Sequence, residues 1–184
     1  MSMTTGRIPD DRRQLAVYLN DHVSGATSGV ELSRRAAATH AGAPAGPALQ
    51  RLAEEIAEDR TSLIQLIRRL DLPVRRHRMA RGWLAEKASR LKSNGRLLRR
   101  SPLSDLLEAE ALRMGVEGKR SLWNALLQIS DLVEGLDRRQ LERLAARATN
   151  QSELLDTVRN EAARRSLTKP EPPDTRTPRR PHRV

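Results

Sequence analysis

Cysteine is absent from the 184-residue sequence, and its absence removes several kinds of chemistry. Without thiols the chain has no disulfide framework, no thiolate nucleophile and no cysteine-ligated zinc or iron–sulfur cluster. The four histidines, His22, His40, His77 and His182, are scattered, and only His22 falls on an apolar stripe. A nucleophile held beside a basic side chain is therefore not expected.

Aromatic residues and long apolar runs are also scarce. The sequence has no Phe, one Tyr and two Trp, so it offers few side chains for stacking on nucleic-acid bases. No apolar run approaches the roughly 20 residues of a membrane span, and residues 1–14 lack the apolar core of a secretory signal. We therefore expect a cytoplasmic protein with no membrane contact.

Strand-like alternation of apolar and polar residues is missing, whereas apolar residues recur at spacings of three and four. This pattern predicts an all-α fold, an antiparallel bundle of four long helices. The expected helices cover residues 10–38, 47–70, 101–133 and 137–166, preceded by an arm over residues 1–10. The bundle domain is expected over residues 11–166. Five prolines after Leu167 predict a disordered basic tail over residues 167–184.

A shorter amphipathic helix is expected between the second and third long helices. Met79/Ala80, Trp83/Leu84, Ala88 and Leu91 supply its apolar face, and arginines cover the other faces. Trp83 and Trp123 are the expected large aromatic core residues. In the first long helix, the small residues from Gly25 to Gly29 predict a close contact with another helix.

Positive charge is concentrated in one internal stretch. Residues 68–100 contain twelve Lys and Arg against two acids, whereas the whole chain has a net charge of +11. Such clustering is typical of a surface that binds polyanions, although a salt-bridged face or a contact with a partner protein would produce the same pattern. The candidate polyanion-binding residues are Arg75, Arg76, Arg78, Arg81, Arg90, Lys92, Arg96, Arg99 and Arg100.

Several predicted helices carry a polar residue near mid-length, on or beside the inward stripe. The candidate metal ligands are His22, Glu31, Glu55, Asp59, Glu108, Glu110 and Glu117, and Gln151 holds the corresponding place in the last helix. Carboxylates projecting into a bundle are typical of di-metal centres. Other interpretations are a boundary with solvent, a buried hydrogen-bonded pair of Asp59 with His22, and pairing with Arg on a neighbouring helix.

In helix order, helix length and mid-helix carboxylates, residues 11–166 resemble the ferritin-like superfamily, and within it the bacterial stress-associated proteins with a short helix between the second and third bundle helices. The resemblance implies a bundle that forms homodimers or larger shells and, in intact members, a di-iron or di-manganese centre. The sequence departs from that pattern at Glu55-Ile56-Ala57-Glu58, where Glu-x-x-His is expected, and at Gln151-Ser152-Glu153.

Because both histidine ligands are missing, we expect a non-catalytic binding or scaffold protein with no cofactor. Two alternatives stay open: a divergent carboxylate-rich bundle that binds iron or manganese, and a protein that binds nucleic acid or another polyanion through residues 68–100.

Overall fold

The computed structural model describes residues 10–74 and 102–168, and these form four α-helices and no strand. The helices are α1 (Asp10–Thr39), α2 (Gly46–Arg69), α4 (Pro102–Gln128) and α5 (Arg138–Leu167). The all-α prediction is confirmed for this part of the chain. The bounds of α1, α2 and α5 agree with the expected ones to within a residue or two.

Helices α1 and α2 form a hairpin closed by a short turn. Pro47 stands in the first turn of α2, where its missing N–H costs no hydrogen bond. Gly46 is required there, because a Cβ would lie 2.5 Å from the carbonyl oxygen of His40. At the other end of α2, Asp71 has a φ of 51° and the amide of Leu72 donates to the carbonyl of Ile67, which ends the helix before Pro73.

Helix α4 ends at Gln128, five residues before the predicted end at Val133. Beyond Gln128 most backbone N–H groups donate to the carbonyl three residues earlier instead of four, as those of Ile129 and Ser130 do. The Ser130 hydroxyl also donates to the carbonyl oxygen of Leu127 at 2.9 Å. This side-chain bond competes with helix continuation. Gly135, with a φ of 94°, then turns the chain toward α5.

Helix α5 begins at the predicted cap. The carboxylate of Asp137 accepts a hydrogen bond from the Gln140 amide at 3.2 Å, which satisfies one of the free N–H groups of the first turn. The Asp-x-x-Gln pattern in the sequence therefore located this helix start correctly.

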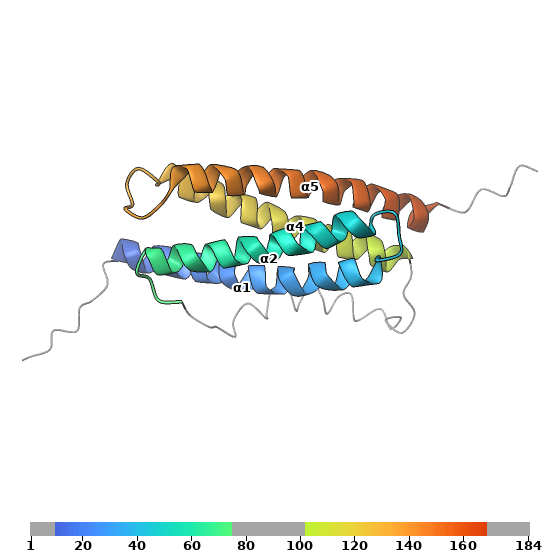
Figure 1. Ribbon diagram of the computed structural model, residues 1–184, viewed down its shortest axis with the longest axis horizontal. Helices are drawn as coiled ribbons and strands as arrows, with labels where there is room; N and C mark the ends of the chain where they lie inside the picture. Colours follow the sequence, from blue (N-terminus) through green and yellow to red (C-terminus); the bar gives the residue numbers. More distant parts are fainter. Residues whose placement is uncertain (1–9, 75–101, 169–184) are drawn as a thin grey trace, which may run out of the picture.

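The four helices lie along a common direction as two hairpins, α1–α2 and α4–α5 (Figure 1). Contacts between the hairpins join α1 to α4 and α2 to α5. Helices α2 and α4 run in the same direction, so α2 ends at one end of the bundle and α4 begins at the other (Figure 1). The intervening stretch therefore has to connect opposite ends of the molecule.

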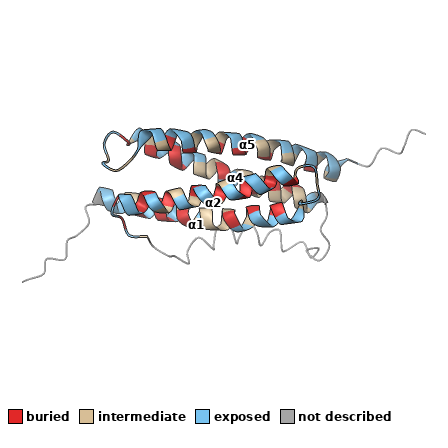
Figure 2. Cartoon of the chain, viewed as in Figure 1, coloured by how far each residue is buried: buried red, intermediate tan, exposed pale blue. Residues whose placement is uncertain are grey.

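Buried residues follow the faces that the helices turn toward one another, and exposed residues cover the outer faces (Figure 2). The core is mainly Leu, Ile, Val and Ala, and Trp123 is buried within it with 1% of its surface exposed. None of the described helices is long and apolar enough to cross a membrane.

Three sequence predictions lie outside the described residues: the N-terminal arm, the short amphipathic helix with Trp83, and the basic tail. The close helix contact predicted at the glycines of α1 is not found at Gly25, where a Cβ would meet no described atom within 4 Å. Gly29 lies in ordinary contact range, since its Cβ would sit 3.9 Å from Ile56 Cγ2.

Two leucines near the end of α4 test the assignment of the core. Leu126 is 1% exposed and Leu132 is 82% exposed. We expect Leu126→Ala to lower the free energy of unfolding by about 2–5 kcal/mol, because the change leaves a cavity. Leu132→Ala should change it by less than about 0.5 kcal/mol. Urea denaturation measures both, and equal effects would contradict this packing.

Candidate functional site

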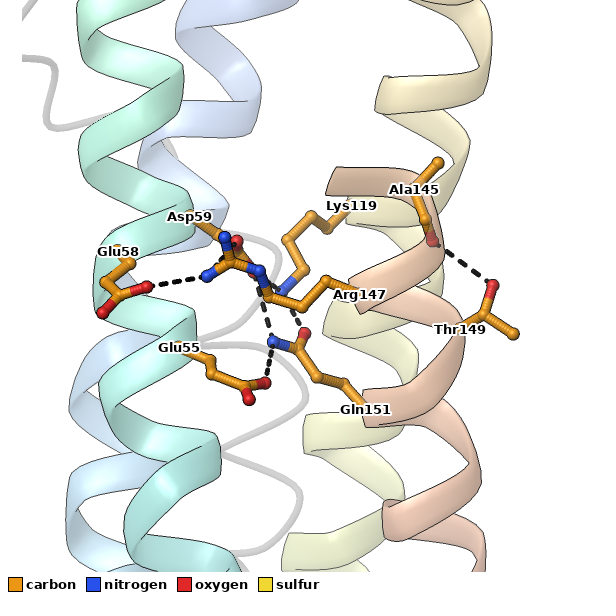
Figure 3. A network of polar contacts seen from close by, with 8 residues as sticks. All are labelled: Glu55, Glu58, Asp59, Lys119, Ala145, Arg147, Thr149 and Gln151. Carbon is orange, nitrogen blue, oxygen red and sulfur yellow. Dashed lines mark hydrogen bonds and ion pairs between the residues drawn. The ribbon is translucent and has the colours of Figure 1, made fainter. Parts of the chain in front are cut away.

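A cluster of polar side chains crosses the interior near the middle of the bundle (Figure 3). We call it the central polar network. Glu55 and Asp59 come from α2, Lys119 from α4, and Arg147 and Gln151 from α5. Asp59 and Gln151 are almost fully buried, with 1% and 2% of their surfaces exposed. Helices α2, α4 and α5 therefore bring the charged and amide groups of this network together in a core that is mainly apolar.

The centre of the network is the ion pair between Asp59 and Lys119. Lys119 Nζ lies 2.5 Å from Asp59 Oδ2, and only 14% of the lysine side chain is exposed. Burial lowers the pKa of the Lys119 ammonium from its ordinary value, and the carboxylate of Asp59 opposes that shift. The buried charge is tolerated because an opposite charge is in direct contact with it.

Gln151 binds both members of this pair at once. Its Oε1 accepts a hydrogen bond from Lys119 Nζ at 2.5 Å. Its Nε2 donates to Glu55 Oε2 at 2.9 Å and to Asp59 Oδ2 at 3.3 Å. An amide suits this place because it offers an acceptor to the ammonium and donors to the two carboxylates.

Arg147 completes the network at its outer edge. Its NH1 lies 2.8 Å from Glu58 Oε2 and 3.5 Å from Asp59 Oδ1. The Glu58 side chain is 68% exposed, so its pair with Arg147 is largely solvated. The Asp59 side chain is only 1% exposed, so its pair with Arg147 is shielded from water. Asp59 therefore has a cation beside each of its oxygens, one from α4 and one from α5.

The seven metal-ligand candidates do not gather at one point. Glu55 and Asp59 meet in the central polar network, where Gln151 binds both carboxylates and Lys119 bonds Asp59 and Gln151. The hydrogen-bonded pair of Asp59 with His22, one of the interpretations of the sequence, is wrong, because Asp59 pairs with Lys119. His22 instead makes an edge contact with Tyr18, with ring centroids 4.8 Å apart.

Two other candidates have partners of their own. Glu117 accepts a hydrogen bond from the Ser152 hydroxyl, which is the main cause of its lowered pKa, and another from Arg120. Glu108 Oε1 lies 3.2 Å from Arg35 Nε. Glu31 is exposed on α1, and Glu110 is half-buried on α4.

A different group of possible ligands lies near the start of α4. His40, Asp105 and Glu108 bring one ligand atom each within 4.8 Å of the others, and His40 Nε2 lies 3.6 Å from Asp105 Oδ1. His40 belongs to the turn after α1, and Asp105 stands in the first turn of α4, so this group lies at an end of these helices rather than in the central polar network. Only Glu108 of this group was a candidate from the sequence.

Lys119 is the functional residue that sequence reasoning missed. It lies within the run from Gly115 to Arg120, which has the composition of a phosphate-binding loop without its spacing. The signal was nevertheless present, because Leu112, Val116, Lys119 and Leu122/Trp123 follow the spacing of the buried stripe of α4. A lysine on that stripe predicts a buried acidic partner.

The nine polyanion-binding candidates between Arg75 and Arg100 lie outside the described residues. Polyanion binding through them stays a prediction from the sequence.

Breaking the central ion pair from one side should be costly. We expect Asp59→Asn to lower the free energy of unfolding by about 3–5 kcal/mol, because Lys119 is left as an uncompensated buried charge. Glu58→Gln, which removes the solvated partner of Arg147, should cost less than about 1 kcal/mol. Replacing both charges, as in Asp59→Leu with Lys119→Met, should restore most of the loss. Chemical denaturation checks all three, and equal losses for Asp59→Asn and Glu58→Gln would contradict the assignment.

His22 should make stability depend on pH. Burial lowers its pKa from the ordinary value of 6.5, more than the nearby Asp21 raises it. The unfolded chain therefore takes up the proton first, so stability is full above about pH 6.5 and falls as pH drops toward the folded-state pKa. We expect the wild type to lose more stability than His22→Gln between about pH 7.5 and about pH 5. Identical losses in urea denaturation at the two pH values would show that His22 is not responsible.

Comparisons of the chain with protein-family models, curated proteins and solved structures give no match.

Proposed function

We propose that this protein is a non-catalytic, ferritin-like helical bundle that acts by binding, as a scaffold or partner-binding protein, without a resident metal. One observation carries the proposal. The ammonium of Lys119 occupies the mid-bundle position between Asp59 of α2 and Gln151 of α5, where a metal ion would need those groups as ligands.

The central polar network has the oxygen atoms of a cation-binding site, and the cation that they bind is the ammonium group of Lys119. Glu55, Asp59 and Gln151 present oxygen atoms toward the interior, as the ligands of a hard metal ion would. A divalent cation at the same place would have to displace the lysine or bind beside a positive charge. Without a free coordination position there is no route to metal-based oxidation at mid-bundle.

The arrangement of the helices supports the ferritin-like part of the proposal. Two hairpins lie side by side, and the chain between α2 and α4 has to run from one end of the bundle to the other (Figure 1). Bundles of the ferritin-like class have one such long crossover connection. The chain path therefore supports the same proposal as the resemblance in helix order and length.

Elemental analysis of protein purified without a metal-affinity tag tests the proposal. After incubation with Fe(II) or Mn(II) and desalting, we expect far less than one metal ion per chain, because the ammonium excludes the ion from the centre. One or two ions per chain that are lost on Glu55→Ala or Asp59→Ala, but kept on the control Glu54→Ala, would overturn it.

The same measurement distinguishes metal bound at the centre of the bundle from metal bound near the start of α4. Metal that is lost on His40→Ala and retained on Glu55→Ala would belong to the group of His40, Asp105 and Glu108. The centre would then still be free of metal, but the proposal that the protein has no resident metal would be overturned.

A further inference from the structure

A cavity of about 490 Å³ lies among α1, α2 and α4, beside the central ion pair. Asp59 and Lys119 form part of its wall, and its apolar part includes Leu63, Leu122 and Trp123, each at most 2% exposed. Pockets that bind small molecules have volumes of roughly 300–1,000 Å³ and combine an apolar lining with a few polar groups. The size and the mixed lining of this cavity therefore fit a small organic molecule.

Two glycines leave space in the cavity. Gly25 of α1 and Gly115 of α4 belong to its lining, and a Cβ added at either would meet no described atom within 4 Å. Side chains that would fill the space between α1 and α4 are therefore missing at these two positions.

Two groups at the cavity have hydrogen-bond donors without acceptors. Arg60 is half-buried in the lining, and its Nε donates to the Thr27 hydroxyl at 2.9 Å. Its two Nη groups form no ion pair with an acid of the described residues. The indole Nε1 of Trp123 is buried and has no hydrogen-bond partner in the described part of the chain. Buried N–H groups normally have an acceptor, so these donors indicate a ligand that supplies one.

The acids at the cavity do not balance these donors. The carboxylate of Asp59 already has Lys119 beside one oxygen and Arg147 beside the other. Asp21 lines the cavity from an exposed position of α1, where water can solvate its charge. The guanidinium of Arg60 is therefore a half-buried charge without a counter-ion among the residues that the structure describes.

We propose that this cavity binds an amphipathic monocarboxylate, an organic acid with an aliphatic body. The carboxylate accepts hydrogen bonds from the Nη groups of Arg60, because a guanidinium presents paired donors in the geometry of a carboxylate. The aliphatic body lies against Leu63, Leu122 and Trp123, where its apolar surface is removed from water. The inference rests on the proposed function in one respect, namely that Lys119 and not a metal ion neutralises Asp59 in the cavity wall.

Calorimetric titration of the full-length protein with sodium decanoate tests the proposal. We expect saturable binding, and about ten-fold weaker binding to Arg60→Gln, because hydrogen bonds to an ionised group are lost. Arg51→Gln removes the same charge from an exposed position of α2 and should leave the affinity unchanged. A wild type that does not bind decanoate, or two variants with the same affinity, would overturn the proposal.

A second pair of variants tests where the ligand lies. Gly115→Leu puts a large side chain into the cavity, whereas Ser121→Leu adds the same side chain at an exposed position of α4. We expect Gly115→Leu to weaken decanoate binding at least about ten-fold and Ser121→Leu to leave it unchanged, since the first occupies the space of the ligand. Circular dichroism checks that both variants fold. Unchanged binding to Gly115→Leu would place the ligand elsewhere and overturn the proposal.

Decylammonium chloride, which has the same alkyl chain and the opposite charge, tests the choice of a carboxylate. The wild type should bind it at least about ten-fold more weakly than decanoate, because Arg60 repels a cation. Equal affinities would show that the alkyl chain alone is recognised and would overturn the proposal. None of these results changes the metal content measured by elemental analysis, so failure of this inference and failure of the proposed function are distinguishable.

Discussion

The constraint on which the structure depends is the placing of one ammonium group inside an apolar bundle. Removing a lysine from water costs several kcal/mol unless an opposite charge and further hydrogen bonds replace the water. Asp59 supplies the charge and Gln151 supplies the acceptor, and they come from two helices other than that of the lysine. Because all three must meet at one point, the relative positions of α2, α4 and α5 are fixed there.

That requirement links the two hairpins. Apolar packing tolerates a range of helix positions, because many leucine and alanine arrangements fill space almost equally well. A buried ion pair with an amide bridge has one satisfactory geometry. The central polar network therefore supplies specificity of alignment across the α2–α5 surface, and the leucine-rich core around it supplies most of the stability.

The same geometry explains why carboxylates in the middle of a bundle need not imply a metal. Inward acids require a cation, and in this chain the cation is a side chain carried by α4. A catalytic metal centre keeps a position open for water or substrate, whereas Lys119 directs its hydrogen bonds to Asp59 and Gln151.

How much of this the sequence predicts depends on the range of the interaction. Local signals located the helices, as at the Asp137 cap, and the spacing of Ile56, Asp59 and Leu63 placed Asp59 correctly on the buried stripe. The end of α4 was missed because the helix stops near a serine bond to Leu127, whereas the only breaker in the sequence there, Gly135, comes seven residues after Gln128. The partner of Asp59 was also missed, because Lys119 is 60 residues away in the chain. The packing of the helices decides which buried stripes meet, and local sequence patterns do not reveal it.

The most direct test of the central claim is a crystal structure of the protein soaked in Mn(II), with anomalous scattering used to locate the ion. The account predicts Lys119 Nζ in contact with Asp59 and Gln151 and no anomalous peak within bonding distance of Asp59 or Glu55. A manganese ion bound by those carboxylates, with the lysine displaced from the centre, would contradict it.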